Sequence, residues 1–142
     1  MNVQKYLEEM TNIQSHLLDY IEDEEAGDGK LEILVNYFDE IEIHDNPHKL
    51  SLFLHFLTQI SNDHHRGPNF FPKIDQILQI FKENIKKYYT NMQIFNIFHS
   101  NKRILLYLIE QNIMIFDTCI KKKIFSKFYD MQSYKFYNYE YS

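Results

Sequence analysis

The chain has few residues of the kinds that cross-link, kink or anchor a protein. Its 142 residues include one cysteine, three glycines and three prolines. One cysteine cannot form an internal disulfide framework, and single glycines cannot build a glycine-rich phosphate-binding loop. The longest apolar run, ILLYLI, is far shorter than the ~20 residues that cross a bilayer, and no signal-peptide pattern opens the sequence. We therefore expect a cytoplasmic protein without a membrane partner.

Charge is distributed unevenly along the sequence. Residues 1–60 carry 3 Lys and 13 Asp or Glu, a net charge of −10, whereas residues 61–142 carry 12 Lys or Arg and 7 Asp or Glu, a net charge of +5. Either the two halves attract each other across one domain, or the second half offers a basic face to a polyanion. We favour the first interpretation, because an acidic chain binds nucleic acid poorly unless its basic residues gather on one face.

Apolar residues in the first half recur at the three- and four-residue spacing of amphipathic helices, and no alternating strand pattern competes. This spacing predicts one helix with a single buried stripe over residues 3–21 and a second helix over residues 31–41. Asn46 can cap, and Pro47 can begin, a third helix that reaches about Ser61.

The second half predicts one long helix followed by shorter ones. A regular apolar stripe predicts a continuous helix over residues 74–88. Each shorter helix begins at a residue that can accept from a free backbone N–H. These caps are Thr90, in a capping box with Gln93, before residues 94–98; Ser100 before residues 101–111; and Asp117 before a stripe of Ile120, Ile124, Phe125 and Phe128.

The predicted fold is therefore all-α, without a sheet. About seven short helices are expected to stack as helical hairpins in an ankyrin-like or α-solenoid-like array. We expect a single domain over residues 1–130, followed by an aromatic-rich tail over residues 131–142.

Histidines are the first candidates for a metal or acid–base site. His64 and His65, in the segment NDHHRGPNFF, are adjacent and point in different directions on a regular element. His48 and His55 share a helix face but are two turns apart, ~10 Å along the axis, which is too far for one zinc ion. We therefore expect no metal site, and we interpret NDHHRGPNFF as the corner between two helices.

Cys119 is the next candidate, as a nucleophile. No cysteine-protease signature surrounds it, and no nucleophile elbow surrounds any serine. We expect Cys119 to pack near the start of the last helix. The sequence therefore predicts no catalytic residue, no cofactor-binding residue and no cofactor, and the protein is not expected to be an enzyme.

Two groups of residues are candidates for contact with other molecules. The first is a tail surface, consisting of Tyr134, Phe136, Tyr137, Tyr139 and Tyr141. The alternative is that these aromatic residues fold back over the last helix or are disordered. The second is a basic patch, consisting of Lys121, Lys122, Lys123 and Lys127. Basic and aromatic groups together can bind RNA, but we favour a solvated helix face because no RNA-binding signature accompanies the patch.

Long segments of the chain resemble a known family. They are NIQSHLLDYIEDEE, SNDHHRGPNFFPKIDQILQIFKENIKKYY, IFNIFHSNKRILLYLIEQNIM and the aromatic tail. Together they closely resemble the N-terminal region, a domain of unknown function, of the divergent ankyrin-repeat proteins of parasitic protists. In that group the region precedes an array of ankyrin repeats. Within this chain, NKRILLYLIEQNIM looks like the second helix of a repeat, with Gln111 and Asn112 where a glycine turn is usual, and TPLH does not occur.

The resemblance implies a non-catalytic module for protein–protein interaction, a scaffold that leads into or caps an ankyrin-type repeat array. The expected partner is another protein, and the tail is its expected junction with repeats or with that partner. The alternative is a nucleic-acid-binding helical domain that uses the basic second half.

Overall fold

A computed structural model of the chain describes residues 3–22, 28–63 and 70–128. The chain divides into two compact units, Met1–Ile80 and Phe81–Ser142. Within the described residues, all regular structure is helical, with eight α-helices, one 3-10 helix and no strand. The predicted all-α fold without a sheet is therefore confirmed. The single domain over residues 1–130 and the stacking of its helices in one array stay predictions.

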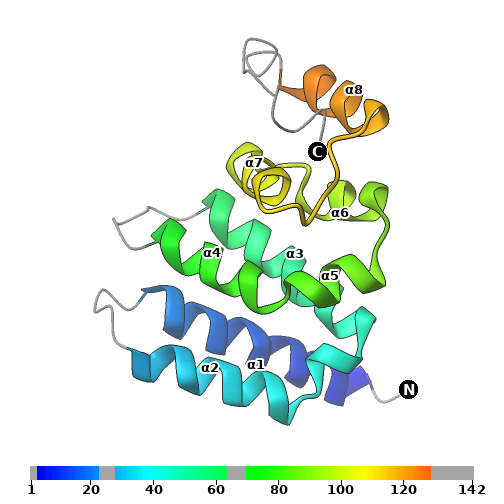
Figure 1. Cartoon of the computed structure of the whole chain (residues 1–142). Helices are drawn as coiled ribbons and strands as arrows, with labels where there is room; N and C mark the ends of the chain where they lie inside the picture. The colour runs from blue at the N-terminus through cyan, green and yellow to red at the C-terminus, as the bar shows by residue number, and fades with distance from the viewer. Residues whose placement is uncertain (1–2, 23–27, 64–69, 129–142) are drawn as a thin grey trace. The chain divides into compact units, whose positions relative to one another are not determined.

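The first unit is built around a helical hairpin. Its elements are α1 (Val3–Glu22), α2 (Asp28–Glu40), η1 (Ile43–Asp45), α3 (Pro47–Asp63) and α4 (Phe70–Ile80). α1 and α2 run side by side in opposite directions, and α1 also contacts α3 and α4 (Figure 1). The apolar stripes of these helices form the core of the unit, which includes the fully buried side chains Leu17, Leu34, Phe38, Leu50, Phe53, Leu54, Leu57, Ile74, Ile77 and Leu78.

Local sequence explains where α3 begins. Asn46 Oδ1 accepts from the backbone N–H groups of His48 and Lys49, each at 3.1 Å. Pro47 occupies the first helical position, where its missing N–H costs no hydrogen bond, as predicted. The helix continues to Asp63, close to the predicted end.

A buried lysine closes the end of α1. Lys73, on α4, is only 6% exposed, and its Nζ donates to the backbone oxygen of Tyr20 at 2.8 Å. Tyr20 lies in the last turn of α1, where carbonyl oxygens lack partners within the helix. The same ammonium group lies 5.0 Å from the centre of the Tyr20 ring, within cation–π range. Lys73 therefore ties α4 to the end of α1.

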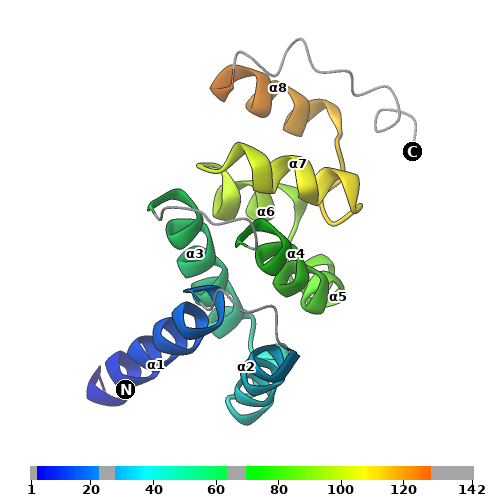
Figure 2. The ribbon, with the colours of Figure 1, turned by 90° about the vertical axis from the view of Figure 1, so that its left-hand side faces the viewer.

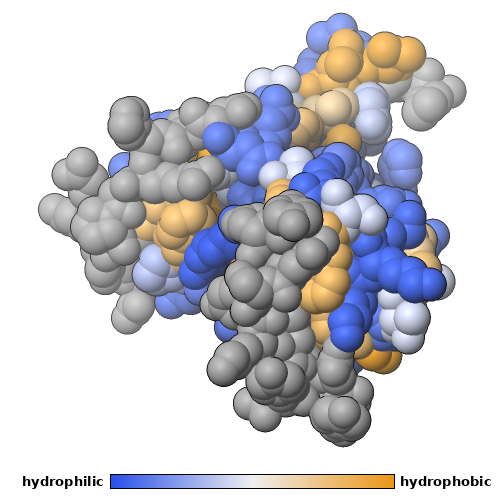
Figure 3. All heavy atoms as spheres, turned by 90° about the horizontal axis from the view of Figure 1, so that it is seen from above, coloured by the Kyte–Doolittle hydropathy of each residue, from blue (hydrophilic) through white to orange (hydrophobic). Residues whose placement is uncertain are grey.

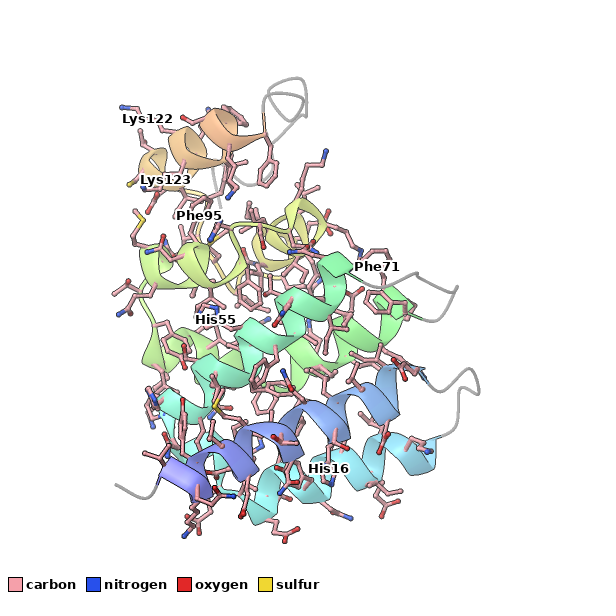
Figure 4. The ribbon with its side chains drawn as sticks, turned by 180° about the vertical axis from the view of Figure 1, so that it is seen from behind. His16, His55, Phe71, Phe95, Lys122 and Lys123 are labelled. Atoms are coloured by element: carbon pink, nitrogen blue, oxygen red, sulfur yellow. The ribbon has the colours of Figure 1, made fainter. Side chains whose placement is uncertain are left out.

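The second unit has four short helices in its described part, residues 81–128: α5 (Lys82–Tyr88), α6 (Asn91–Phe98), α7 (Lys102–Glu110) and α8 (Thr118–Lys127). α6 contacts both α7 and α8, and Figure 2 shows it next to α7. Phe95, labelled in Figure 4, belongs to the core of the second unit. The other buried apolar residues of α6, α7 and α8 are Ile94, Ile97, Phe98, Ile104, Leu105, Leu108, Ile109, Ile120 and Ile124.

The continuous helix predicted over residues 74–88 is wrong. Two helices, α4 and α5, occupy this segment, and between them lies Phe81, with φ −99° and ψ 5°. Ile77, Phe81 and Ile85 are all fully buried, so the apolar stripe continues through the break. Because no glycine or proline marks the position either, periodicity could not reveal it.

The caps of the last three helices follow the predicted chemistry, with one shift. Thr90 and Gln93 form the predicted capping box, and Asp117 caps α8 as predicted. α7 begins one residue later than predicted, since its cap is Asn101 and not Ser100. The Asn101 side chain accepts from the backbone N–H three residues further on, at 2.9 Å. Serine and asparagine both cap well, so the sequence could not choose between neighbours.

Cys119 does not pack as expected, because it is exposed on α8. The helix turns Ile120 and Ile124 inward. Neighbouring residues on a helix differ by ~100° around its axis, so Cys119 lies off the buried stripe.

The turn after α7 holds asparagine where glycine is usual. Asn112 has a φ of 57°, in the left-handed region. The backbone N–H groups of Asn112 and Ile113 donate to the carbonyl oxygens of Ile109, at 3.1 Å, and Leu108, at 2.8 Å. These two bonds form a Schellman motif, which places its left-handed residue at this position.

Substitutions at Asn112 test this turn. We expect Asn112→Ala to lower the free energy of unfolding by about 1 kcal/mol, because its Cβ strains a left-handed backbone and its side chain offers no local hydrogen bond. Asn112→Gly should leave the free energy of unfolding unchanged or raise it by up to about 0.5 kcal/mol, because glycine adopts this conformation freely. Urea unfolding measures both. A glycine variant less stable than the alanine variant would contradict the assignment.

Substitution of Lys73 tests the closure of α1. We expect Lys73→Met to lower the free energy of unfolding by about 1.5–3 kcal/mol, because the Tyr20 carbonyl loses a charged donor. Lys30→Met makes the same change at an exposed position on α2, and it should cost less than about 0.5 kcal/mol. Equal losses for both variants in urea unfolding would count against a special role for Lys73.

Candidate interaction surface

The predicted tail surface cannot be followed in the structure. Its aromatic residues lie outside the described part of the chain: Tyr134, Phe136, Tyr137, Tyr139 and Tyr141. His64 and His65 lie outside it as well. The tail stays a prediction.

The basic patch lies on α8. Lys122, Lys123 and Lys127 are exposed, Lys121 is partly buried, and Lys122 and Lys123 extend away from the helix in Figure 4. Lys127 Nζ donates to His99 Nδ1. At ~100° per residue, Lys121 and Lys123 differ by ~200° around the helix axis. Lys123 and Lys127 are one turn apart and therefore lie on the same side of α8, whereas Lys121 lies on another side. The basic patch as a contact surface stays a prediction.

Histidines in the described ranges do not form a cluster. No group of three His, Cys, Asp or Glu side chains within residues 3–22, 28–63 and 70–128 is arranged to hold a metal ion. His48 and His55 are exposed at different positions on α3, and His55 is labelled in Figure 4. The described helices also include none with the length and apolar character that crossing a membrane requires.

Exposed apolar side chains point to a different surface. Seen from above, hydrophilic residues cover most of the described surface, with smaller hydrophobic areas between them (Figure 3). In the described residues, four large hydrophobic side chains are mostly exposed, and these are Val3 (64%), Leu7 (52%), Ile33 (59%) and Ile115 (63%). Val3 and Leu7 are one turn apart on α1, so their side chains are neighbours.

The single buried stripe predicted for residues 3–21 is wrong in its first half. The buried residues of α1 are Ile13, Leu17, Tyr20 and Ile21, all in its second half. The same stripe continues toward the N-terminal end through two exposed residues, Val3 and Leu7, and two partly exposed ones, Tyr6 and Met10. We use the name α1 surface for Val3, Tyr6, Leu7 and Met10 together with the groove described next.

Unequal helix lengths explain the exposed half. α1 has 20 residues and its antiparallel neighbour α2 has 13. At 1.5 Å per residue, about 10 Å of α1 extends beyond α2. Periodicity predicts which side of a helix is apolar but not whether a neighbour covers it. The unequal lengths of the two predicted stripes were the one signal that could have revealed this surface.

A groove of about 150 Å³ opens beside this half of α1, at the beginning of α3. Its apolar lining is Tyr6, Met10, Ile13 and Leu52, and its polar lining is Glu9, Asn46, His48 and Lys49. A cavity of about this volume accommodates a benzene-sized group. The groove can therefore hold one large apolar side chain.

An ion pair joins the two helices at the groove. Lys49 Nζ pairs with a carboxylate oxygen of Glu9, and it also donates to the backbone oxygen of Ile41 at 3.2 Å. Both charged side chains are partly buried, at 29% and 27% exposure. The pair therefore holds α1 against the start of α3 and fixes the shape of the groove.

Acidic groups lie near this surface, between α1 and α2. His16, labelled in Figure 4, stacks on Tyr37, with 3.7 Å between ring centroids and 3° between ring planes. Burial raises the pKa of Tyr37, and the negative charges of Glu9 and Glu40 raise this pKa further. The two carboxylates therefore lie close enough to Tyr37 to act on its hydroxyl group.

The uneven charge of the sequence follows the boundary between the units. Residues 1–80 carry 5 Lys or Arg and 15 Asp or Glu, a net charge of −10. Residues 81–142 carry 10 Lys or Arg and 5 Asp or Glu, a net charge of +5. The α1 surface therefore belongs to a strongly acidic unit.

Tyr37→Phe tests the electrostatics of this region. The pKa of Tyr37 is raised above its ordinary value of 10.0. Its contribution to stability is therefore fully present below about pH 10 and is lost as the pH rises from about 10 through the higher folded-state pKa. Phenylalanine keeps the ring that stacks on His16 but cannot ionise. We expect the free energy of unfolding of Tyr37→Phe to rise relative to that of the unchanged protein above about pH 10. If urea unfolding shows that the difference in free energy of unfolding between the two proteins stays constant across the alkaline range, this expectation is contradicted.

Comparison with known proteins identifies no relative. The chain matches no protein-family model, and no curated protein or solved structure is similar enough to count as a match. The resemblance to the ankyrin-repeat family therefore rests on the sequence segments alone.

Proposed function

We propose that this chain is a non-catalytic module that binds another protein through the α1 surface. The observation that carries this proposal is the exposed pair Val3 and Leu7, 64% and 52% exposed, beside a groove on the same helix. Apolar side chains gain about 25 cal/mol for each Å² that they remove from water, so a partner that covers this pair gains free energy. The family resemblance supports the same class of function, a scaffold that leads into or caps an ankyrin-type array.

The partner that fits is an amphipathic helical segment with basic residues beside its apolar stripe. One apolar side chain of the segment enters the groove, and those one turn along cover Leu7 and Val3. Lysine or arginine residues of the segment meet Glu8, which is exposed, whereas Glu9 is already paired with Lys49. The net charge of −10 on residues 1–80 favours approach of a basic segment and disfavours an acidic one.

Binding of a defined peptide tests the proposal. The probe is a fluorescent amphipathic helix of leucine and lysine, about 18 residues or five turns long, measured by fluorescence anisotropy with the full chain. We expect Leu7→Glu to weaken binding about tenfold, because it replaces a central apolar contact. The added negative charge would strengthen binding that was only electrostatic, so the two explanations predict opposite signs.

Ile33→Glu is the matched control. Ile33 is similarly exposed, at 59%, and lies on α2 away from the lining of the groove. Its substitution makes the same chemical change in the same unit, and affinity for the leucine–lysine peptide should stay within about twofold. Tighter binding by Leu7→Glu, or equal losses for both variants, would reject the α1 surface as the docking site.

A further inference from the structure

A second groove lies in the second unit, between the junction of α5 with α6 and the segment that follows α7. Its volume is about 310 Å³. Clefts that bind ligands start at about this size, ~300 Å³. Its apolar lining is Tyr89, Ile94, Ile113 and Ile115. Ile115 is 63% exposed, so an apolar side chain stands at the groove with much of its surface in water.

One side chain fixes the backbone at this groove. Asn91 Oδ1 accepts from the N–H of Ile115 at 3.0 Å. Asn91 Nδ2 donates to the backbone oxygen of Ile115 and to Asp117 Oδ2, both at 3.3 Å. Because its N–H and C=O are both held, Ile115 is positioned before any partner arrives, which lowers the entropic cost of binding.

The polar lining of the groove is suited to an acidic ligand. Lys86 lines it and is exposed, and Lys82 lies one turn away on the same side of α5. Neither lysine makes an ion pair with another described residue. Asn112 also lines the groove and is exposed, so its amide can donate to and accept from the backbone of a bound segment.

We propose that this groove binds an acidic segment of a protein partner. An apolar side chain of the segment packs against Ile115 and Tyr89, and a neighbouring carboxylate meets Lys86. This inference goes beyond the α1 surface, since it concerns the other unit and the opposite charge. The net charge of +5 on residues 81–142 favours such a segment.

RNA is also an acidic ligand, but it fits this groove less well. Three of the four apolar lining residues are isoleucine, and only Tyr89 offers an aromatic face on which a base can stack. The lining therefore favours a peptide with aliphatic and acidic side chains.

A charge-reversed peptide tests the proposal on the full chain. The probe is a short fluorescent peptide of alternating leucine and glutamate, measured by anisotropy at about 0.15 M salt, where distant charges are screened. We expect Ile115→Lys to weaken its binding about tenfold, although the added positive charge would strengthen a purely electrostatic attraction. Leu7→Glu, in the first unit, should change this affinity less than about twofold, whereas it weakens the leucine–lysine peptide. The proposals for the α1 surface and for the second groove can therefore be confirmed or rejected independently of each other.

Two further variants separate the groove from general charge and from misfolding. Lys86→Glu should weaken the leucine–glutamate peptide about tenfold, and Lys123→Glu, the same change at an exposed position on α8, less than about twofold. Asn112→Gly should weaken binding of the leucine–glutamate peptide about threefold without loss of thermal stability, so unfolding cannot explain the weaker binding.

Three outcomes would overturn the proposal. The first is unchanged or tighter binding of the leucine–glutamate peptide by Ile115→Lys. The second is an equal loss for Lys86→Glu and Lys123→Glu, which indicates a diffuse field. The third is a random-sequence RNA that displaces the peptide and loses affinity in Lys86→Glu, which identifies the groove as a polyanion site.

Discussion

The hydrogen bond from Lys73 to the carbonyl oxygen of Tyr20 fixes where α1 ends in the first unit. A buried ammonium group is costly without partners, and here it has a helix-terminal carbonyl oxygen and the face of an aromatic ring. The buried residues of α1, Ile13, Leu17, Tyr20 and Ile21, all lie in the half of the helix that ends at this contact. The exposed half of α1 is the opposite half, which extends beyond the shorter α2.

The ion pair of Glu9 and Lys49 completes this arrangement. It lies where α1 passes the start of α3, a start that Asn46 and Pro47 define locally. Partly buried pairs hold geometry better than they add stability, because desolvation offsets much of their attraction. The pair therefore matters here for the shape of the groove, and the apolar residues around it supply the free energy that a partner would gain.

Much of the fold could be predicted from the sequence because its signals are local. The caps at Asn46, Thr90 and Asp117 act over three residues, and the apolar stripes act over one helix, so both can be read without knowledge of the neighbours. The break at Phe81 could not be predicted, since its stripe continues and no residue type marks it. Lys73 is a similar case, because its partner lies 53 residues away in the sequence.

The candidate sites were harder to predict for the same reason. Exposure depends on which elements cover a residue, and Leu7 and Leu17 occupy one stripe although only Leu17 is buried. In the basic patch, Lys123 and Lys127 lie one turn apart on the same side of α8, whereas Lys121 is partly buried on another side, a difference that depends on what packs against the helix. The opposite case is the second groove, where Lys86 and Ile115 are far apart in the sequence and line one site.

Asn112 connects the fold of the second unit to this groove. Its backbone needs the left-handed conformation that ends α7, and glycine meets this need without a side chain. Asparagine meets it at some cost and brings an amide to the lining of the groove. Glycine would fold equally well at this position and at a lower conformational cost. The side chain of Asn112 is therefore a candidate for a role in binding. In this groove, the amide can bond a peptide backbone while Lys86 supplies charge and Ile115 supplies apolar surface.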